Sequence, residues 1–336
     1  AGAGAGAGAG ALRRAVAAVE EAGIDQLTVG DHLTFRGGQG ADGLVLAGAV
    51  AALAERTEVA TSVYQLGLRH PLVAARQIVD VAALAAGGFV LGVGIGDEGR
   101  SEAEACGVDP AGRGRRLDES LAIVRRLVSG QTVDHDGEFF QLRHVAVGPP
   151  PVRPVPILVG GRSDAAVRRA GLLGDGWLGR WVSAKRFARV VAQVEVTAWE
   201  AGRLGGSNAS APNVSAPNVG GVAASGGSNG VAWRHGMQIW CGFGPTRERA
   251  VAGLAAEMEN RYGLPFDRFA QWCPVGRPSD IADALLPFVG AGAAEINVVA
   301  VAADPFEAIE GVAQVRRLLR SATEITGDLS VVAVGP

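Results

Sequence analysis

The sequence predicts an α/β protein built as a single (β/α)8 TIM barrel, and three observations support this prediction. Apolar runs of strand length alternate with helical patterns along most of the chain, as expected for a parallel sheet. Seven such runs are present, so one further strand would complete the eight units of a closed barrel. The length of 336 residues is common for single barrels, although a doubly wound open sheet would show the same alternation.

Each predicted strand is short and apolar and precedes a segment with helical periodicity. Strands are expected at residues 27–32, 59–64, 89–97, 156–161, 176–180, 237–243 and 295–301. Helices are expected at residues 12–22, 44–55, 71–85, 113–127, 162–173, 183–201, 246–261, 279–289 and 305–319. Proline opens the third of these helices at the first helical position, where its missing N–H costs nothing.

Three segments lie outside this pattern. Residues 1–10 alternate Ala and Gly, which are poor strand formers, yet the missing strand of the barrel would have to come from them. Residues 205–230 are a low-complexity segment of Gly, Ser, Asn and Ala, predicted as a flexible loop rather than an ordered lid. We therefore expect one barrel domain over residues 1–320, followed by a C-terminal tail at 321–336 without an assigned role.

Composition excludes several classes of protein. The net charge of −3 gives no reason to expect nucleic acid or an anionic membrane as a partner. The 3 cysteines are far apart and the 5 histidines lack the spacing of metal ligands, so neither a disulfide framework nor a metal site is indicated. No apolar run of about 18 residues suggests a membrane span. We expect a soluble cytoplasmic protein with a small-molecule substrate.

The strongest functional pattern lies in the central part of the chain. The strand that starts at Phe89 is an unbroken apolar run, and Gly94 and Gly96 then leave the backbone open to a flat ligand. Asp97 follows at a strand end, where barrel enzymes place working groups, although a turn or helix-capping carboxylate would look the same. An Arg-Gly-Arg-Arg-Leu-Asp-Glu helix start and an Asp-Gly hairpin at 133–140 come next.

In the order, spacing and residue identities of these motifs, the chain resembles the bacterial luciferase-like monooxygenase superfamily. The resemblance is greatest to the branch that uses coenzyme F420, a deazaflavin, and it covers most of residues 11–320. It implies a luciferase-like barrel that transfers hydride between F420 and an organic substrate. An FMN-dependent monooxygenase of the same fold and a barrel that binds deazaflavin without turnover are the alternatives. Analogy with such relatives also suggests a homodimer.

The resemblance assigns roles to polar residues at two strand ends. Asp31 and His32 end the strand predicted at 27–32, where a helix-capping Asp and a solvated His are the structural alternative. The resemblance implies that Asp31 contacts the cofactor ring and that His32 is catalytic, a role suited to a side chain that can donate a proton at physiological pH. Asp97 stands where sugar-phosphate dehydrogenases of this branch have a Glu acid or base, and Asp is one methylene shorter.

The resemblance also implies that two further segments bind the cofactor. Ser62 and Val63 correspond to a non-prolyl cis peptide, which forms a bulge behind the middle ring of the deazaflavin. The segment 160–163 lies between a strand and a helix, where N–H groups and the helix dipole favour an anion. The resemblance places the ribityl-phosphate end of the cofactor there. The residues of this segment are Gly160, Gly161, Arg162 and Ser163.

Aromatic residues of the later loops are the predicted lining of the substrate pocket, with core packing as the alternative for each of them. They are Trp181, Trp240, Phe243, Tyr262, Phe269 and Trp272. Arg180 falls where the sugar-phosphate members have a phosphate-binding Thr, and no replacement cluster of cations is evident. Arg36 stands where those members have a Trp. A glucose phosphate substrate is therefore disfavoured, and Arg180 is predicted to contact a different substrate.

Overall fold

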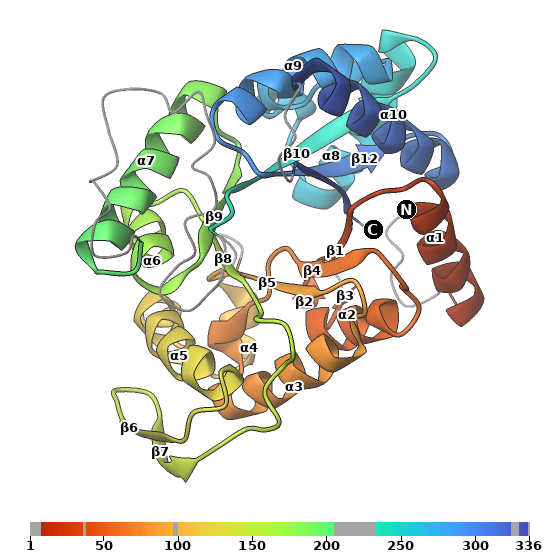
Figure 1. The fold of residues 1–336 in the computed structure, drawn as a ribbon. Coiled ribbons are helices and arrows are strands. Elements are labelled where there is room, and N and C mark those ends of the chain that lie inside the picture. The colour runs from red at the N-terminus through yellow and green to blue at the C-terminus, as the bar shows by residue number, and fades with distance from the viewer. Residues whose placement is uncertain (1–7, 36–37, 97–99, 205–232, 324–328, 335–336) are drawn as a thin grey trace.

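The computed structural model describes residues 8–35, 38–96, 100–204, 233–323 and 329–334. Within these ranges, eight parallel strands form a barrel surrounded by helices, which confirms the predicted fold class (Figure 1). The barrel strands are β1 (Gln26–Val29), β4 (Glu58–Thr61), β5 (Phe89–Val93), β8 (Ile157–Gly160), β9 (Gly176–Arg180), β10 (Gly236–Phe243), β12 (Glu295–Val301) and β13 (Ser330–Val334). They follow the order β10-β12-β13-β1-β4-β5-β8-β9, and β9 also pairs with β10, which closes the ring.

Helices cover the outer face of the barrel. They are α1 (Ala9–Glu21), α2 (Gly43–Ala51), α3 (Pro71–Leu84), α5 (Arg113–Val128), α6 (Asp164–Leu173), α7 (Ala184–Glu200), α8 (Arg247–Tyr262), α9 (Pro278–Gly290) and α10 (Pro305–Thr323). Two hairpins lie outside this pattern, β2 (His32–Phe35) with β3 (Gln39–Ala41) and β6 (Val133–Asp136) with β7 (Gln141–Val145). The remaining short elements are the strand β11 (Val275–Gly276) and the helix α4 (Ser101–Ala105). Three 3-10 turns are also present, η1 (Leu66–Leu68), η2 (Phe266–Arg268) and η3 (Ala270–Trp272). No helix in the described ranges is long and apolar enough to cross a membrane.

The helices pack through apolar stripes at helical spacing, and α5 is a clear example. Its side chains Leu117, Leu121, Val124 and Leu127 each have 0% exposure. Burying a side chain of this size stabilises the fold by about 1.5–3 kcal/mol. Inside the barrel, Ala60, Val90 and Leu158 form a separate small apolar cluster. The barrel is therefore filled by side chains at mid-height, and its functional groups lie toward the strand ends.

The strand expected at the N-terminus comes instead from the other end of the chain. Ala9 and Gly10 already belong to α1, and residues 1–7 lie outside the described residues. β13 pairs in parallel with both β1 and β12, so it fills the place between them. Its sequence is Ser-Val-Val-Ala-Val, rich in β-branched residues that favour strands, whereas alternating Ala and Gly do not. Part of the segment predicted as a tail is thus a strand of the barrel.

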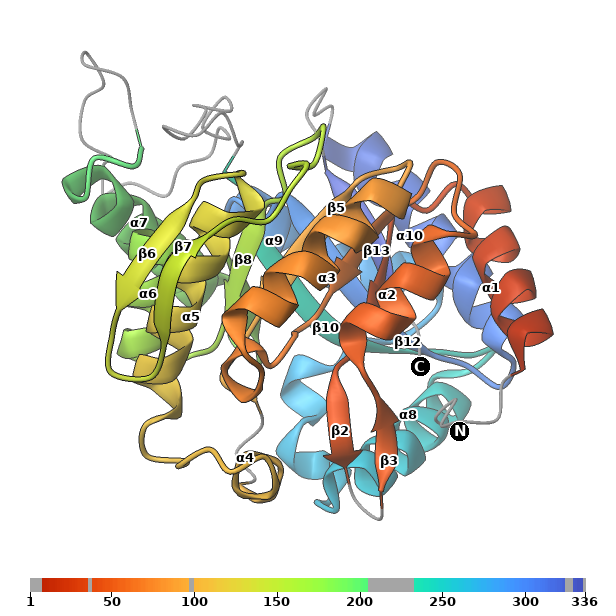
Figure 2. The same ribbon diagram turned by 90° about the horizontal axis from the view of Figure 1, so that it is seen from below.

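Three predicted strands extend beyond the observed ones at their C-terminal ends. β1 ends at Val29, β4 at Thr61 and β5 at Val93, whereas the sequence predicts continuation to residues 32, 64 and 97. Figure 2 shows the hairpin β2–β3, the short helix α4 and helix α8 together at one end of the barrel. These elements follow the C-terminal ends of β1, β5 and β10, so residues predicted as strand ends lie in the loops of this end.

At the opposite end, one arginine lies between two carboxylates. Arg234 donates to both carboxylate oxygens of Glu58 at 3.0 and 2.7 Å, and its guanidinium also lies 2.6 Å from Glu295. Glu295 is only 1% exposed. Burial raises the pKa of Glu295, with Arg234 opposing the shift and the charge of Glu58 adding to it. One guanidinium therefore pairs with two carboxyl groups, and burial makes Glu295 hard to ionise.

Glu295→Gln is expected to raise the free energy of unfolding at neutral pH by about 1 kcal/mol. A carboxyl whose pKa is raised by folding binds more protons in the folded state, so the free energy of unfolding falls as pH rises above about 4.3 toward the folded pKa. The amide of glutamine does not ionise, so the variant does not lose this part of the free energy of unfolding as pH rises. Urea unfolding between pH 5 and pH 8 measures it, with Glu58→Gln as the control, which should destabilise because it removes the bidentate partner of Arg234. If both variants destabilise equally, Glu295 is an ordinary ion-pair partner.

Candidate active site

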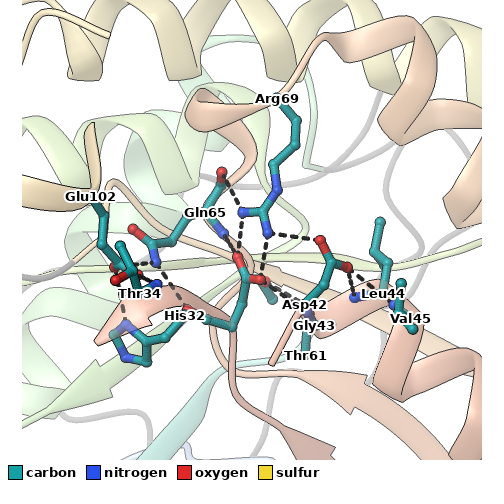
Figure 3. Close-up of polar contacts among 12 residues, drawn as sticks. His32, Thr34, Asp42, Gly43, Leu44, Val45, Thr61, Gln65, Arg69 and Glu102 are labelled. Carbon is teal, nitrogen blue, oxygen red and sulfur yellow. Dashed lines mark hydrogen bonds and ion pairs between the residues drawn. The ribbon is translucent and has the colours of Figure 1, made fainter. Parts of the chain in front are cut away.

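A polar network at the C-terminal end of the barrel joins His32, Gln65 and Glu102 (Figure 3). His32 begins β2, Gln65 precedes the turn η1, and Glu102 lies in the first turn of α4. These residues follow three barrel strands that are neighbours in the ring, β1, β4 and β5. Because the C-terminal ends of parallel strands lie at the same edge, residues from distant parts of the sequence meet there.

The geometry of Glu102 fixes the orientation of the imidazole of His32. Its Oε2 atom lies 3.1 Å from Nδ1 of His32 and accepts a hydrogen bond from Nε2 of Gln65 at 2.9 Å. Its Oε1 atom accepts from the backbone N–H of Thr34 at 2.8 Å. A carboxylate can only accept, so Nδ1 of His32 carries the proton. Nε2 of His32 has no protein partner among the described residues, and the side chain is 29% exposed.

Glu102 is ionised at neutral pH. Burial alone would raise the pKa of its carboxyl group, but hydrogen bonds from Thr34, Gln65 and His32 outweigh burial and hold that pKa below its usual value. His32 and Glu102 therefore form a carboxylate–imidazole pair whose outer nitrogen is available for proton transfer.

Asp31 is occupied by other protein groups. Its Oδ1 atom accepts from the N–H of Gly43 at 2.9 Å and its Oδ2 atom from the N–H of Gln65 at 2.8 Å. Arg69 donates to both oxygens at 2.7 and 2.6 Å, and also to Asp42 at 3.0 Å. The side chain of Asp31 has 0% exposure. Asp31 therefore orders the loops that carry His32 and Gln65, and its contact with the cofactor ring stays a prediction.

The peptide bond between Ser62 and Val63 is cis, which confirms the prediction for this pair. Val63 lies against two of the predicted cofactor-binding glycines. A Cβ atom on Gly94 would lie 2.6 Å from the side chain of Val63, and one on Gly160 would lie 3.0 Å from it. Gly96 has φ +87°, and a side chain there would collide with Gln65. These glycines therefore allow β5 and β8 to approach the bulge closely, whether or not a ligand lies above them.

The predicted anion site lies at the start of α6. Ser163 caps this helix, its hydroxyl oxygen accepting from the N–H of Ala166 at 3.3 Å. Gly161 has φ +134°, and its carbonyl accepts from the indole of Trp177 at 2.7 Å. Arg162 is exposed. Backbone N–H groups at a helix start suit a phosphate, whereas Asp164 in the same turn opposes one.

The predicted substrate residues lie together beside α8. Rings of Trp181, Tyr262 and Phe269 have centroids 5.2–6.2 Å apart, and Trp240 lies 6.0 Å from Tyr262. Trp272 packs against the same apolar cluster, as do the side chains of α8. Phe243 belongs to the main core of the barrel instead, so core packing is its role. Four of the predicted aromatic residues thus form one wall, with Trp272 at its edge.

Two residues of the network, Gln65 and Glu102, are missing from the predicted site, while the predicted Asp97 lies outside the described residues. Gln65 donates to the carbonyl of Asp31 at 2.9 Å as well as to Glu102, so it links the two polar groups. The only signal for Glu102 in the sequence is a carboxylate a few positions after the glycine-rich strand end. In the described residues, no group of three or more His, Cys, Asp or Glu side chains is placed to hold a metal ion.

This barrel carries a cis peptide after β4 and a histidine after β1, and these two strands are neighbours in the ring. The model of the luciferase-like monooxygenase family matches residues 1–295, so the chain belongs to that family. The F420-dependent glucose-6-phosphate dehydrogenase of Beutenbergia cavernae is 37% identical over 165 residues, 47% of this chain and 49% of that protein. The chain spans about half the length of the curated relatives that it matches.

Solved structures show the same fold with two different cofactors. An F420-dependent secondary alcohol dehydrogenase, in complex with an F420–acetone adduct, has a TM-score of 0.70 and 19% identity over 93% of this chain and 94% of that chain. The oxygenating constituent of 3,6-diketocamphane monooxygenase from Pseudomonas putida, in complex with FMN, has a TM-score of 0.70 and 17% identity over 92% of each chain. At these identities the likeness shows the fold alone.

Proposed function

We propose that this protein is an oxidoreductase that transfers hydride between coenzyme F420 and a small organic substrate. The observation that carries the proposal is the His32–Glu102 pair, which leaves Nε2 of His32 without a partner among the described residues. His32 follows β1, and the Ser62–Val63 cis peptide follows the neighbouring strand β4. The similarity to F420-dependent glucose-6-phosphate dehydrogenases supports the choice of cofactor. Glucose phosphate itself is not proposed as the substrate, because Arg180 replaces the phosphate-binding Thr implied for those enzymes.

The residues at this end of the barrel fit a deazaflavin in two respects. At the strand ends around the bulge, Ser62, Val63, Gly94 and Gly160 have small side chains or none, which suits a flat ring system. The start of α6 offers backbone N–H groups, with the exposed Arg162 next to them, for the phosphate of the cofactor. Both ends of the ligand would thus have complementary surfaces on neighbouring strands.

Proton transfer is the part of the reaction assigned to this chain's own residues. F420 supplies or accepts the hydride when it is bound. Reduction of a carbonyl also requires a proton, and the protonated His32 can donate one from Nε2. In the oxidative direction, neutral His32 can accept the proton of a hydroxyl group at the same atom. Glu102 keeps Nδ1 protonated in both directions, so the imidazole does not have to change tautomer between turnovers.

Steady-state turnover tests the proposal. The full chain is incubated with oxidised or reduced F420 and a panel of alcohols, ketones and unsaturated acids, and absorbance of the deazaflavin is followed. F420-dependent turnover of any member supports the proposal. Turnover that needs FMN, a reductase and oxygen would replace it by the monooxygenase alternative. Tight F420 binding without turnover across the panel would instead indicate a carrier protein.

F420 is expected to bind more tightly than FMN, and its affinity is expected to fall as ionic strength rises. Both ligands would place a phosphate at residues 160–163, but F420 continues into an acidic tail. The tail would suit arginines near strand ends or helix starts, namely Arg69, Arg113, Arg115, Arg116 and Arg162. Of these, Arg69 pairs with the buried Asp31, whereas Arg115 pairs with Glu138 at the surface. Arg162→Ala is expected to weaken F420 binding by up to about fivefold, since exposed pairs contribute about 0–1 kcal/mol. Titrations of both ligands at low and high salt provide the measurement. Tighter binding of FMN at both salt concentrations would contradict the F420 assignment.

A further inference from the structure

Arg180 points into the barrel at the end of β9. Its register partner on β10 is Gln238, and paired residues present their side chains on the same face of a sheet. Gln238 donates from Nε2 to the hydroxyl of Ser62 at 3.0 Å. β10 and the Ser62 loop after β4 are on opposite sides of the ring, so the side chain of Gln238 crosses the interior. Arg180 therefore faces the same interior space, close to the bulge.

The guanidinium of Arg180 has no carboxylate partner in the described part of the chain. Several other partly buried arginines of this protein have one. Arg69 pairs with Asp31, Arg125 with Asp175 and Arg234 with Glu58. The guanidinium carbon of Arg180 lies 5.9 Å from the centroid of the Trp181 ring. A half-buried cation without a counter-charge is costly unless an anion joins it.

An aromatic wall adjoins this cation. Trp181 has φ +55°, a left-handed conformation that is rare for a bulky side chain and costs about 1–3 kcal/mol. This conformation accompanies a ring that packs on Tyr262 and Phe269 rather than on the main core of the barrel. The neighbouring cation, Arg261, lies 3.7 Å from Glu257, so Arg180 is the charge that this wall offers to a ligand.

We propose that the substrate is a carboxylate attached to a flat apolar or aromatic body. Its carboxylate pairs with Arg180 in the two-pronged geometry that a guanidinium offers, and its body lies against Trp181 and Tyr262. This placement holds the rest of the molecule near the bulge and Nε2 of His32. The inference rests on the proposed function and specifies its substrate class. It also accounts for the loss of the phosphate site, since one guanidinium suits a monoanion.

Calorimetric titration with a matched pair of probes tests the inference. The full chain, without and with F420, is titrated with 2-naphthoate and with 2-naphthamide, which differ in the charged group alone. The parent protein is expected to bind the acid at least about tenfold more tightly than the amide, as for a charge-assisted pair. Arg180→Gln should abolish that preference and Arg180→Lys should retain part of it. Arg189→Gln, on the exposed side of α7, is the matched control and should retain all of it.

The outcomes separate this inference from the proposed function, because neither probe needs to be oxidised or reduced. Equal binding of acid and amide by the parent protein would overturn the inference, and so would a preference that survives in Arg180→Gln. A loss of F420 affinity in Arg180→Gln without any change in naphthoate binding would assign the guanidinium to the cofactor and would also overturn it. If F420 does not turn over but the acid preference depends on Arg180, the substrate class stands and the cofactor assignment falls.

Discussion

His32→Ala is expected to slow hydride transfer by a factor of about 10²–10⁴ while changing F420 affinity by less than about threefold. A positioned general acid or base typically contributes that factor to the rate. The imidazole is a small part of the surface that a ligand as long as F420 would contact, so its loss should hardly affect binding. Single-turnover measurements with reduced F420 separate the rate of the chemical step from the affinity for the cofactor.

His135→Ala is the matched control for this prediction. His135 also pairs with a carboxylate, lying 2.9 Å from Glu119, but it belongs to the hairpin β6–β7 outside the barrel. Its replacement should leave the rate unchanged. If His32→Ala lowers rate and F420 affinity equally, His32 is a binding residue, and unchanged turnover would remove it from the mechanism.

Glu102→Gln distinguishes two effects of Glu102 on His32, namely orientation of the imidazole and the negative charge of the carboxylate. The amide oxygen can still accept from Nδ1 of His32, so the ring keeps its tautomer and place. The negative charge is lost, but the hydrogen bond at Nδ1 remains. The rate of hydride transfer is therefore expected to fall less than it does in His32→Ala. A loss as large as that of His32→Ala would show that the reaction requires the charge of Glu102 and not only the orientation of the ring.

The order of seven barrel strands and nine helices could be predicted from the sequence because each of them carries its own periodicity. α5, with Leu117, Leu121 and Leu127 on one buried face, begins where the sequence predicts. The place of β13 could not be predicted in this way. A five-residue apolar strand looks the same in a tail as in a barrel, and only its pairing with β1 and β12 distinguishes the two. The cytoplasmic location and the homodimer stay predictions.

The sequence predicts a site residue when its position in the chain is enough to suggest its role. It does not predict a role that depends on side chains far away in the sequence. His32 lies where the resemblance implies, although it begins a hairpin rather than ending a strand. The roles of Asp31 and Glu102 depend on partners 38 and 70 residues away in the sequence. No local pattern distinguishes a carboxylate that an arginine has neutralised from one that faces a ligand. Such partners become visible only when the strand ends are brought together.

Arg69→Ala is expected to lower the free energy of unfolding by about 3–5 kcal/mol, the usual cost of leaving one charge of a buried pair uncompensated. The hydrogen bonds and charge of Asp31 outweigh burial and raise the pKa of Arg69. The guanidinium also lies 4.5 Å from the ring centroid of the buried Tyr64, and that contact would be lost too. Urea unfolding measures the change.

Arg76→Ala is the control, since Arg76 forms an exposed ion pair with Asp80 in α3. Its replacement should lower the free energy of unfolding by less than about 1 kcal/mol.

The double variant of Asp31→Ala and Arg69→Ala should lower the free energy of unfolding by less than the sum of the two single changes, because it leaves no unpaired carboxylate. Asp31 also holds the N–H of Gln65, and Gln65 holds Glu102, so Arg69→Ala should slow turnover as well. If Arg69→Ala costs no more than Arg76→Ala, the buried pair does not support the site. Asp31 would then be available to contact the cofactor ring, as the resemblance implies.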